Sequence, residues 1–257
     1  MRTLRSDDSE SRIQLIKREV REEIWRYLED HDLARFPRPV YNRIPNFVGA
    51  EKAASFMRKL KEFSDARVVK VNPDSPQVHV RRLILKEGKT LLMPTPRLSS
   101  GFLKLEPEQI QKHMIDKAAT IAGAFHLADK VPLNGLPMID LIVAGSVAVS
   151  LKGGRIGKGE GYSELEYGIL RECGLVTDDV KVVTTVHDCQ IVKPFPVQKH
   201  DVPVDYILTP TRMQETHTAL PKPKGIYWDC VTMDMLHEMP ILGELREQQM
   251  IRRSVEG

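Results

Sequence analysis

The sequence predicts an α/β fold: an open, mostly parallel sheet with helices on both faces. Short segments rich in β-branched and apolar residues recur along the chain, at 67–71, 90–93, 140–144, 181–192 and 204–208. Segments whose apolar residues fall three or four positions apart, as on one face of a helix, separate several of them, at 77–87, 106–124 and 162–173. Strands that alternate with helices form parallel sheets, and such sheets bind ligands at the carboxyl ends of their strands.

Length and composition fit one large domain in a reducing compartment. The chain has 257 residues, of which 41% are hydrophobic and 28% charged, enough to bury a full core. A net charge of +3 does not by itself indicate nucleic acid or a membrane as partner, and it fits a basic pocket for an anionic substrate equally well. The three cysteines form neither a CxxC pair nor a zinc-binding spacing. No stretch approaches a membrane span, so we expect a cytoplasmic protein.

The N-terminal part predicts a polar tail followed by an amphipathic helix. Residues 1–11 are polar, and from Ser11 to His31 apolar residues recur at helical spacing. Lys17 and Arg21 are four positions apart and therefore adjacent on the helix. A solvated surface is the simpler explanation for these cations, but the pair would hold an anion if the helix docks over a pocket.

The segments before the first predicted strand and after residue 225 predict an extended connection, two helices and one further strand. The prolines of 36–47 predict an extended connection, and residues 50–63 a helix. Residues 226–231 look strand-like, and 232–239 predict a helix that stops at Pro240. We therefore expect a flexible N-terminal tail at 1–11, an α/β domain at 12–243 and a mobile C-terminal tail at 244–257.

A glycine-rich basic loop at 154–161 connects a buried strand to the helix at 162–173. It contains three glycines at alternate positions and two interleaved cations, namely Gly157, Gly159, Gly161, Arg155 and Lys158. Bare backbone N–H groups at a helix start bind polyphosphate. The spacing is neither that of the P-loop nor that of the dinucleotide fingerprint. We predict phosphate binding, with a purely structural turn as the alternative.

Two further charged residues stand where ligands gather in such a sheet. Arg97 follows a buried strand, where a guanidinium pairs with carboxylate or phosphate, although a surface arginine in a rigid turn explains it as well. Glu164 lies in the first turn of the helix after the glycine loop. The helix dipole stabilises an acid there, and beside phosphates the same acid is placed to bind Mg²⁺.

Four segments, in one order over about residues 12–212, carry a resemblance to a known family. They are Lys17-Arg-Glu-Val-Arg21, Gly88-Lys-Thr-Leu-Leu-Met-Pro-Thr-Pro-Arg97, the stretch from Asp140 to Glu164 with Gly154-Arg-Ile-Gly-Lys-Gly-Glu-Gly-Tyr162, and His200-Asp-Val-Pro-Val-Asp-Tyr-Ile-Leu-Thr209. This pattern resembles the 5-formyltetrahydrofolate cyclo-ligase (methenyltetrahydrofolate synthetase) family. Arg35-Phe-Pro-Arg-Pro39 and Thr209-Pro-Thr-Arg212 resemble the methenyltetrahydrofolate synthetase domain-containing proteins more closely still. One departure concerns chemistry, because the family's Gly-Tyr-Tyr-Asp is Gly161-Tyr-Ser-Glu164 here.

The resemblance implies a cyclo-ligase fold, similar to the sugar-phosphate isomerase and CoA-transferase type, over residues 12–243. It also implies an ATP- and Mg²⁺-dependent ligase that forms a C–N bond. In that reaction the formyl oxygen of 5-formyltetrahydrofolate attacks the γ-phosphate. The folate N10 then attacks the activated carbon, and phosphate leaves to give 5,10-methenyltetrahydrofolate.

The resemblance assigns roles by position. The residues it implies for ATP are Lys17, Arg21, Arg155, Gly157, Lys158, Gly159, Gly161 and Tyr162. Arg155 and Lys158 would be catalytic, Glu164 and Asp201 would bind magnesium, and Arg97 would steer the glutamate tail of the folate. The alternative is a non-catalytic nucleotide-binding or RNA-associated protein that retains the fold. RNA is a partner only under this alternative, and a membrane under neither.

Overall fold

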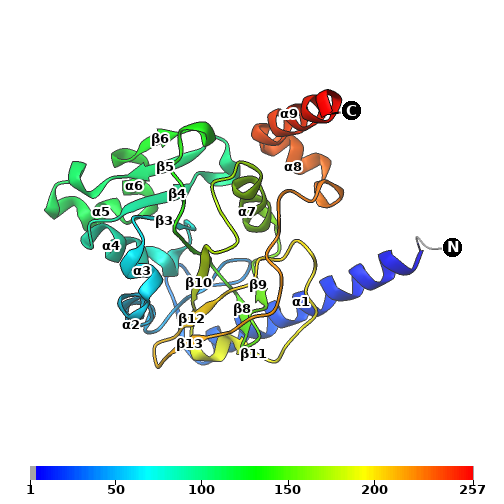
Figure 1. Ribbon diagram of the computed structural model, residues 1–257. Helices are drawn as coiled ribbons and strands as arrows, with labels where there is room; N and C mark the ends of the chain where they lie inside the picture. The colour runs from blue at the N-terminus through cyan, green and yellow to red at the C-terminus, as the bar shows by residue number, and fades with distance from the viewer. Residues whose placement is uncertain (1–3, 257) are drawn as a thin grey trace.

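A computed structural model describes residues 4–256 and contains a central sheet of eight strands (Figure 1). From one edge to the other these are β13 (Met213–Glu215), β12 (Tyr206–Leu208), β10 (Lys181–Thr185), β7 (Leu141–Val143), β3 (Val68–Val71), β4 (Thr90–Pro94), β5 (Phe102–Leu105) and β6 (Asp129–Val131). The strands from β12 to β4 pair in parallel. The pairs β12–β13, β4–β5 and β5–β6 at the two edges are antiparallel. The predicted open, mostly parallel sheet is confirmed.

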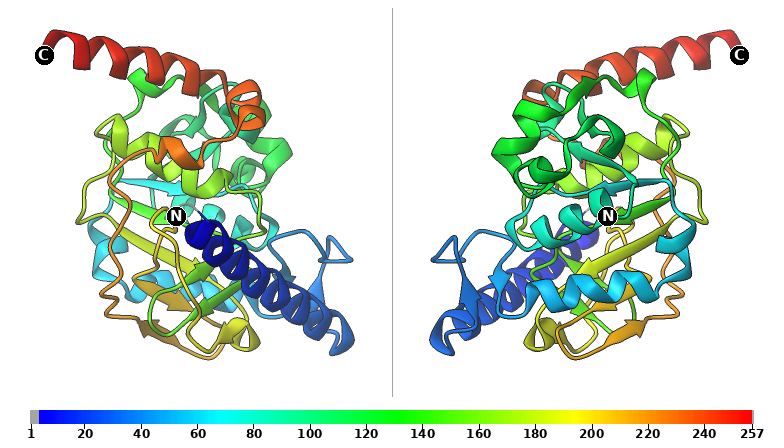
Figure 2. Two further views of the ribbon diagram at one scale, coloured as in Figure 1. Left: turned by 90° about the vertical axis from the view of Figure 1, so that its right-hand side faces the viewer. Right: turned by 90° about the vertical axis from the view of Figure 1, so that its left-hand side faces the viewer.

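Helices cover both faces of this sheet (Figures 1 and 2). On one face lie α2 (Ala50–Ser55), α3 (Lys61–Asp65), α4 (Val78–Lys86), α5 (Ile115–Ala118) and α6 (Ile121–Leu127). On the other lie α7 (Tyr162–Glu172), α8 (Met233–Glu238) and α9 (Pro240–Glu256). Each face has its own apolar core, because successive residues of a strand point to opposite sides. In β7, for example, Leu141 and Val143 join the core under α4, whereas Ile142 joins the core under α7.

The long helix α1 (Leu4–Asp30) packs on a separate small sheet rather than on the central one. This sheet consists of β11 (Ile191–Val192), β8 (Ala148–Ser150) and β9 (Arg155–Ile156). Ile24 and Leu28 of α1 share an apolar cluster with Val147 and Ile156. A further pair of short strands, β1 (Ala34–Arg35) and β2 (Asn46–Phe47), lies in the proline-rich connection. Packing of α1 on β8 and β9 brings the helix beside the glycine-rich loop.

Several predicted elements are wrong in their extent. The helix expected at 50–63 breaks at Leu60, whose backbone is extended, and the strand expected at 181–192 is interrupted by a 3-10 turn at Asp188–Gln190. The helix expected at 106–124 is replaced by two 3-10 turns followed by α5 and α6. The segment 226–231 contains a 3-10 turn instead of a strand. Local periodicity cannot detect such breaks, because turn geometry and tertiary packing decide them.

The chain ends also differ from the sequence-based expectation. Helix α1 already begins at Leu4. The helix predicted at 232–239 is confirmed as α8, which ends before Pro240, but Pro240 then starts a further helix, α9, that was not predicted. Proline is favourable at the first position of a helix, because its missing N–H would have no intrahelical partner there. The described parts of 1–11 and 244–257 are therefore helical, and the division of the chain at residues 12 and 243 stays a prediction. Among the helices of residues 4–256, none combines the length and the apolar character of a bilayer span.

Arg81 of α4 holds the loop that follows β3 against the sheet. The side chain is 1% exposed, and burial lowers the pKa of its guanidinium to about 10. The guanidinium donates to the backbone carbonyls of Asn72 (2.9 Å), Asp74 (3.0 Å) and Ala119 (2.7 Å). These three hydrogen bonds satisfy carbonyl groups that no regular strand or helix would pair. Arg81 thus fixes a segment at the carboxyl edge of the sheet.

We expect Arg81→Met to lower the free energy of unfolding by about 2–4 kcal/mol, because it leaves the carbonyls of Asn72 and Ala119 without the donor they have in the structure. The neighbouring Arg82 forms a half-exposed ion pair with Asp116 and is the matched control. Arg82→Met should cost less than about 1 kcal/mol. Urea denaturation followed by circular dichroism measures both, and equal losses would contradict a special role for Arg81.

Candidate functional site

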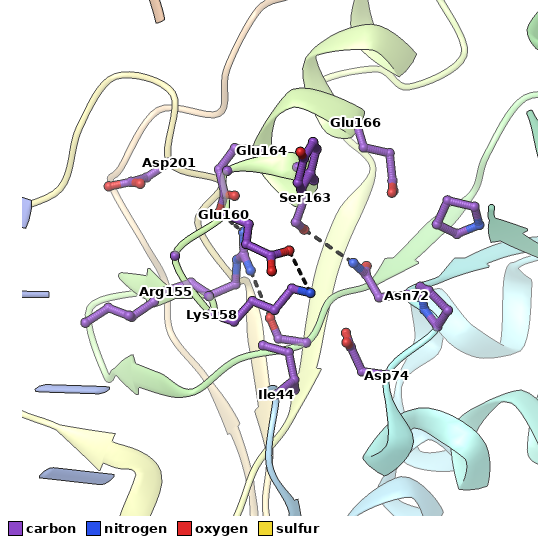
Figure 3. A pocket seen from close by; sticks show the side chains of 18 of the residues that line it. Ile44, Asn72, Asp74, Arg155, Lys158, Glu160, Ser163, Glu164, Glu166 and Asp201 are labelled. Atoms are coloured by element: carbon purple, nitrogen blue, oxygen red, sulfur yellow. Dashed lines mark hydrogen bonds and ion pairs between the residues drawn. The ribbon is translucent and has the colours of Figure 1, made fainter. Parts of the chain in front are cut away.

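A cleft of about 540 Å³ opens at the carboxyl ends of β3, β4 and β7 (Figure 3). Its walls come from α1, from the segments that follow these strands, from the glycine-rich loop with the start of α7, and from His200 and Asp201. All site residues expected from the sequence line this one cleft: Lys17, Arg21, Arg97, Arg155, Gly157, Lys158, Gly159, Gly161, Tyr162, Glu164 and Asp201. The structure brings them together, although they are spread over much of the chain.

The glycine-rich loop enters α7 through a left-handed turn. Gly159 and Gly161 have φ angles of 104° and 76°, a backbone region that residues with a Cβ rarely adopt. A Cβ on Gly159 would also lie 3.1 Å from Cζ of Arg21. Gly161 is the N-cap of α7 and has no side chain to satisfy the first N–H groups of the helix. The loop therefore presents backbone donors at a helix start to the cleft, as anion binding requires.

The two cations of α1 dock into the cleft wall. Lys17 is 4% exposed, and its Nζ lies 2.7 Å from Oδ1 and 2.5 Å from Oδ2 of Asp201. The Nε of Arg21 donates to the carbonyl oxygen of Gly157 (2.8 Å). Burial lowers the pKa of Arg21, while the charges of Glu164 and Asp201 oppose that shift. The solvated-surface interpretation of this pair is therefore wrong, because both side chains contact residues of the site.

Arg155 and Lys158 have different surroundings. Arg155 is 2% exposed, forms an ion pair with Glu164, and donates to the carbonyls of Gly145 (2.8 Å) and Val202 (3.3 Å). All three of its nitrogens thus contact protein, which favours a positioning role. Direct contact between Arg155 and phosphate stays a prediction. The half-exposed Lys158 pairs with Glu160 of the same loop (2.7 Å), so its ammonium remains accessible from the cleft.

Sequence reasoning missed a buried ion pair beneath the cleft. Lys70 of β3 pairs with Glu166 of α7, and its Nζ also donates to Oδ1 of Asn72 (2.9 Å). Burial raises the pKa of the Glu166 carboxyl, while Lys70 opposes the shift. Asn72 in turn donates to the hydroxyl of Ser163 (3.4 Å). A lysine within the otherwise apolar Val68–Val71 strand was the available signal, because a buried charge needs a partner.

Asp74 is a second cleft residue whose role was not predicted from the sequence. It follows β3, and a Cβ on Gly145 would lie 2.4 Å from its Oδ2, so the glycine makes room for the carboxyl group. Burial raises the pKa of Asp74, and nearby cations, Lys158 foremost, lower it. Figure 3 shows both Asp74 and Lys158 among the side chains that line the cleft.

At the rim, a residue from α8 contacts two predicted site residues. The Nη1 of Arg97 lies 2.9 Å from Oε1 of Glu238, and the hydroxyl of Tyr162 donates to Oε2 of the same carboxylate. The guanidinium of Arg97 also lies over the Tyr162 ring, 5.7 Å from its centroid. Arg97 itself has a left-handed backbone (φ 54°). Contact from the C-terminal segment was not expected from the sequence.

Comparison with known proteins places the chain in a family. The sequence model of the 5-formyltetrahydrofolate cyclo-ligase family matches residues 11–210. The methenyltetrahydrofolate synthase domain-containing protein of Mus musculus is 50% identical over 238 residues, which cover 91% of this chain and 64% of that protein. Its Homo sapiens counterpart is 47% identical, with 91% of this chain and 62% of that protein covered. The chain thus spans less than two thirds of these relatives.

More distant relatives include enzymes named for the reaction. The 5-formyltetrahydrofolate cyclo-ligase of Mycolicibacterium smegmatis is 24% identical over 148 residues, 56% of this chain and 72% of that protein. The NMR structure of Aquifex aeolicus 5,10-methenyltetrahydrofolate synthetase has a TM-score of 0.48 at 20% identity and covers 79% of this chain and 94% of that one. The match over residues 11–210 and the vertebrate relatives show that the chain belongs to the 5-formyltetrahydrofolate cyclo-ligase family.

Proposed function

We propose that the protein converts 5-formyltetrahydrofolate to 5,10-methenyltetrahydrofolate in a reaction that consumes ATP and requires Mg²⁺. Family membership supports the substrate and the reaction type. One observation carries the proposal: a single cleft combines a glycine-rich helix start, an accessible lysine and carboxylates. Phosphoryl transfer depends mainly on positioning and on neutralising charge, and this set of groups fits that need.

The nucleotide phosphates would bind at the glycine-rich loop. Backbone N–H groups at the start of α7 would donate to phosphate oxygens, and Lys158 would exchange its contact with Glu160 for one with phosphate. Lys17 and Arg21 would act mainly by holding Asp201 and the loop carbonyl of Gly157 in place. Arg155 would fix Glu164 at the helix start. Preorganised groups of this kind need little rearrangement when the charge moves.

The residues present fit a magnesium ion that arrives with the nucleotide. Within residues 4–256, no three His, Cys, Asp or Glu side chains are arranged to hold a metal by themselves. Mg²⁺ is usually held by one or two carboxylates together with phosphates and water. The ion pair of Glu164 with Arg155 uses Oε1, which leaves Oε2 as the donor for a cation, whereas Lys17 engages both oxygens of Asp201. The metal would neutralise phosphate charge, with Glu164 as its principal protein ligand.

The folate would occupy the remainder of the cleft. Arg97 at the rim would pair with the carboxylates of its glutamate tail. The formyl oxygen takes the γ-phosphoryl group and ADP leaves. N10 then attacks the activated carbon, and phosphate leaves together with the proton of N10. Tyr162 would shape the space between the two ligands. The protein's part is to hold the formyl oxygen in line with the phosphate and to exclude water.

The decisive assay incubates the protein with 5-formyltetrahydrofolate, ATP and Mg²⁺ and follows the absorbance of methenyltetrahydrofolate. We expect product formation that requires all three components. Measurable ATP binding without product above background would refute the proposed activity. It would favour the alternative of a non-catalytic nucleotide-binding or RNA-associated protein.

We expect Lys158→Ala to raise the KM for ATP about tenfold or more, because it removes a charge-assisted contact with phosphate. The dissociation constant for 5-formyltetrahydrofolate should change less than about twofold. Lys152→Ala is the control, because Lys152 is exposed and lies outside the cleft lining. Equal weakening of both ligands would contradict the role given to Lys158.

Glu164→Gln should raise the Mg²⁺ concentration for half-maximal activity by about tenfold, because an amide is a weaker ligand than a carboxylate. Glu164→Asp keeps the charge and should stay within a few-fold of the unmodified protein. Thermal unfolding of each variant reports separately on the lost partner of Arg155. If Glu164→Gln lowers stability but leaves the Mg²⁺ dependence unchanged, Glu164 serves only to position Arg155.

A further inference from the structure

The rim of the cleft already contains a carboxylate-binding arrangement with a carboxylate in it. Arg97 and the Tyr162 hydroxyl contact the two oxygens of Glu238, one donor to each oxygen. An arginine with a second donor is the usual arrangement for recognising a carboxylate. The group held there belongs to α8, which follows the family-matched residues 11–210.

The backbone around Glu238 is anchored to the body of the protein. Met239 and Leu242, which follow it, are fully buried in the core under α7. On its other side, the Met235 methyl lies 3.0 Å from where a Cβ of Gly161 would stand. The segment therefore presents Glu238 at a fixed distance from the rim, and only the side chain has to move for the carboxylate to leave Arg97.

The contact is weak enough to be displaced. The side chains of Arg97 and Glu238 are 54% and 31% exposed. Half-exposed ion pairs contribute little net free energy, because water competes for both charges. A ligand carboxylate of similar geometry can therefore take the place of Glu238.

We propose that Glu238 is a built-in competitor for the carboxylate of the substrate and that it lowers the affinity of the cleft for carboxylate-bearing folates. The inference rests on the proposed function and deepens it. Glu238 occupies Arg97 and Tyr162 until a substrate carboxylate displaces it. A substrate without that carboxylate leaves Glu238 in place and does not gain from Arg97.

The test compares two ligands by direct binding, without turnover. One is 5-formyltetrahydrofolate, and the other is the methylamide of 5-formyltetrahydropteroate, which has neither the glutamate nor any other free carboxylate. Glu238→Gln should tighten binding of the first about two- to fivefold and leave the second unchanged, because the neutral amide no longer competes for Arg97. Glu238→Ala should act in the same direction. Glu244→Gln, at an exposed acid on α9, is the matched control and should affect neither ligand.

Arg97→Met removes the group for which the two carboxylates compete. It should abolish most of the preference for binding the glutamate-bearing ligand. Equal changes for both ligands on Glu238→Gln, or no change, would overturn the inference. Failure of every variant to bind either compound would overturn both the inference and the proposed substrate. Selective binding without product formation would contradict only the proposed activity, whereas turnover with an affinity that Glu238→Gln leaves unchanged would contradict only the inference.

Discussion

Two ion pairs on the first turns of α7, one buried and one largely buried, hold the candidate site together. Glu164 pairs with Arg155 of β9, and Glu166 pairs with Lys70 of β3. Removing one partner of a buried pair costs about 3–5 kcal/mol, because the other charge stays desolvated. The start of α7 is thus tied to the small sheet and to the central sheet at the same time. The glycine-rich loop, which runs directly into this helix, has little freedom to shift.

The charges of the cleft fall into two groups with different tasks. Lys17, Arg21 and Arg155 are engaged with protein oxygens, so they set the shape of the walls. Lys158 is half-exposed and its partner is a neighbour in the same loop. This division gives a rigid frame with one adaptable cation, the combination expected where an anion must enter and leave. Ser163 stands where the family motif has its second tyrosine. It belongs to the rigid part of the cleft wall, because its hydroxyl accepts a hydrogen bond from the side chain of Asn72.

The fold class and the set of residues that line the cleft could be predicted from the sequence. The contacts and roles of individual residues could be predicted less well. The parallel strands and α7 follow from apolar runs and helical spacing, and the ordered motifs located the cleft residues. Periodicity did not show that α1 packs on β8 and β9, or that 106–124 is broken, because distant contacts decide both. It also missed the partners of Arg155, Lys70 and Arg97. Those partners lie on α7 and α8, and no local sequence pattern specifies which side chains of separate elements will pair.

The ion pair of Lys17 with Asp201 joins residues 184 positions apart. Contacts of such separation form late, because the intervening chain must first be ordered. During synthesis, α1 leaves the ribosome long before β8 and β9, the strands that cover Ile24 and Leu28. The apolar face of this helix therefore stays uncovered until the ribosome has made β8 and β9, which end at residue 156. The nascent chain thus carries an exposed amphipathic helix for which a chaperone or a neighbouring chain can compete.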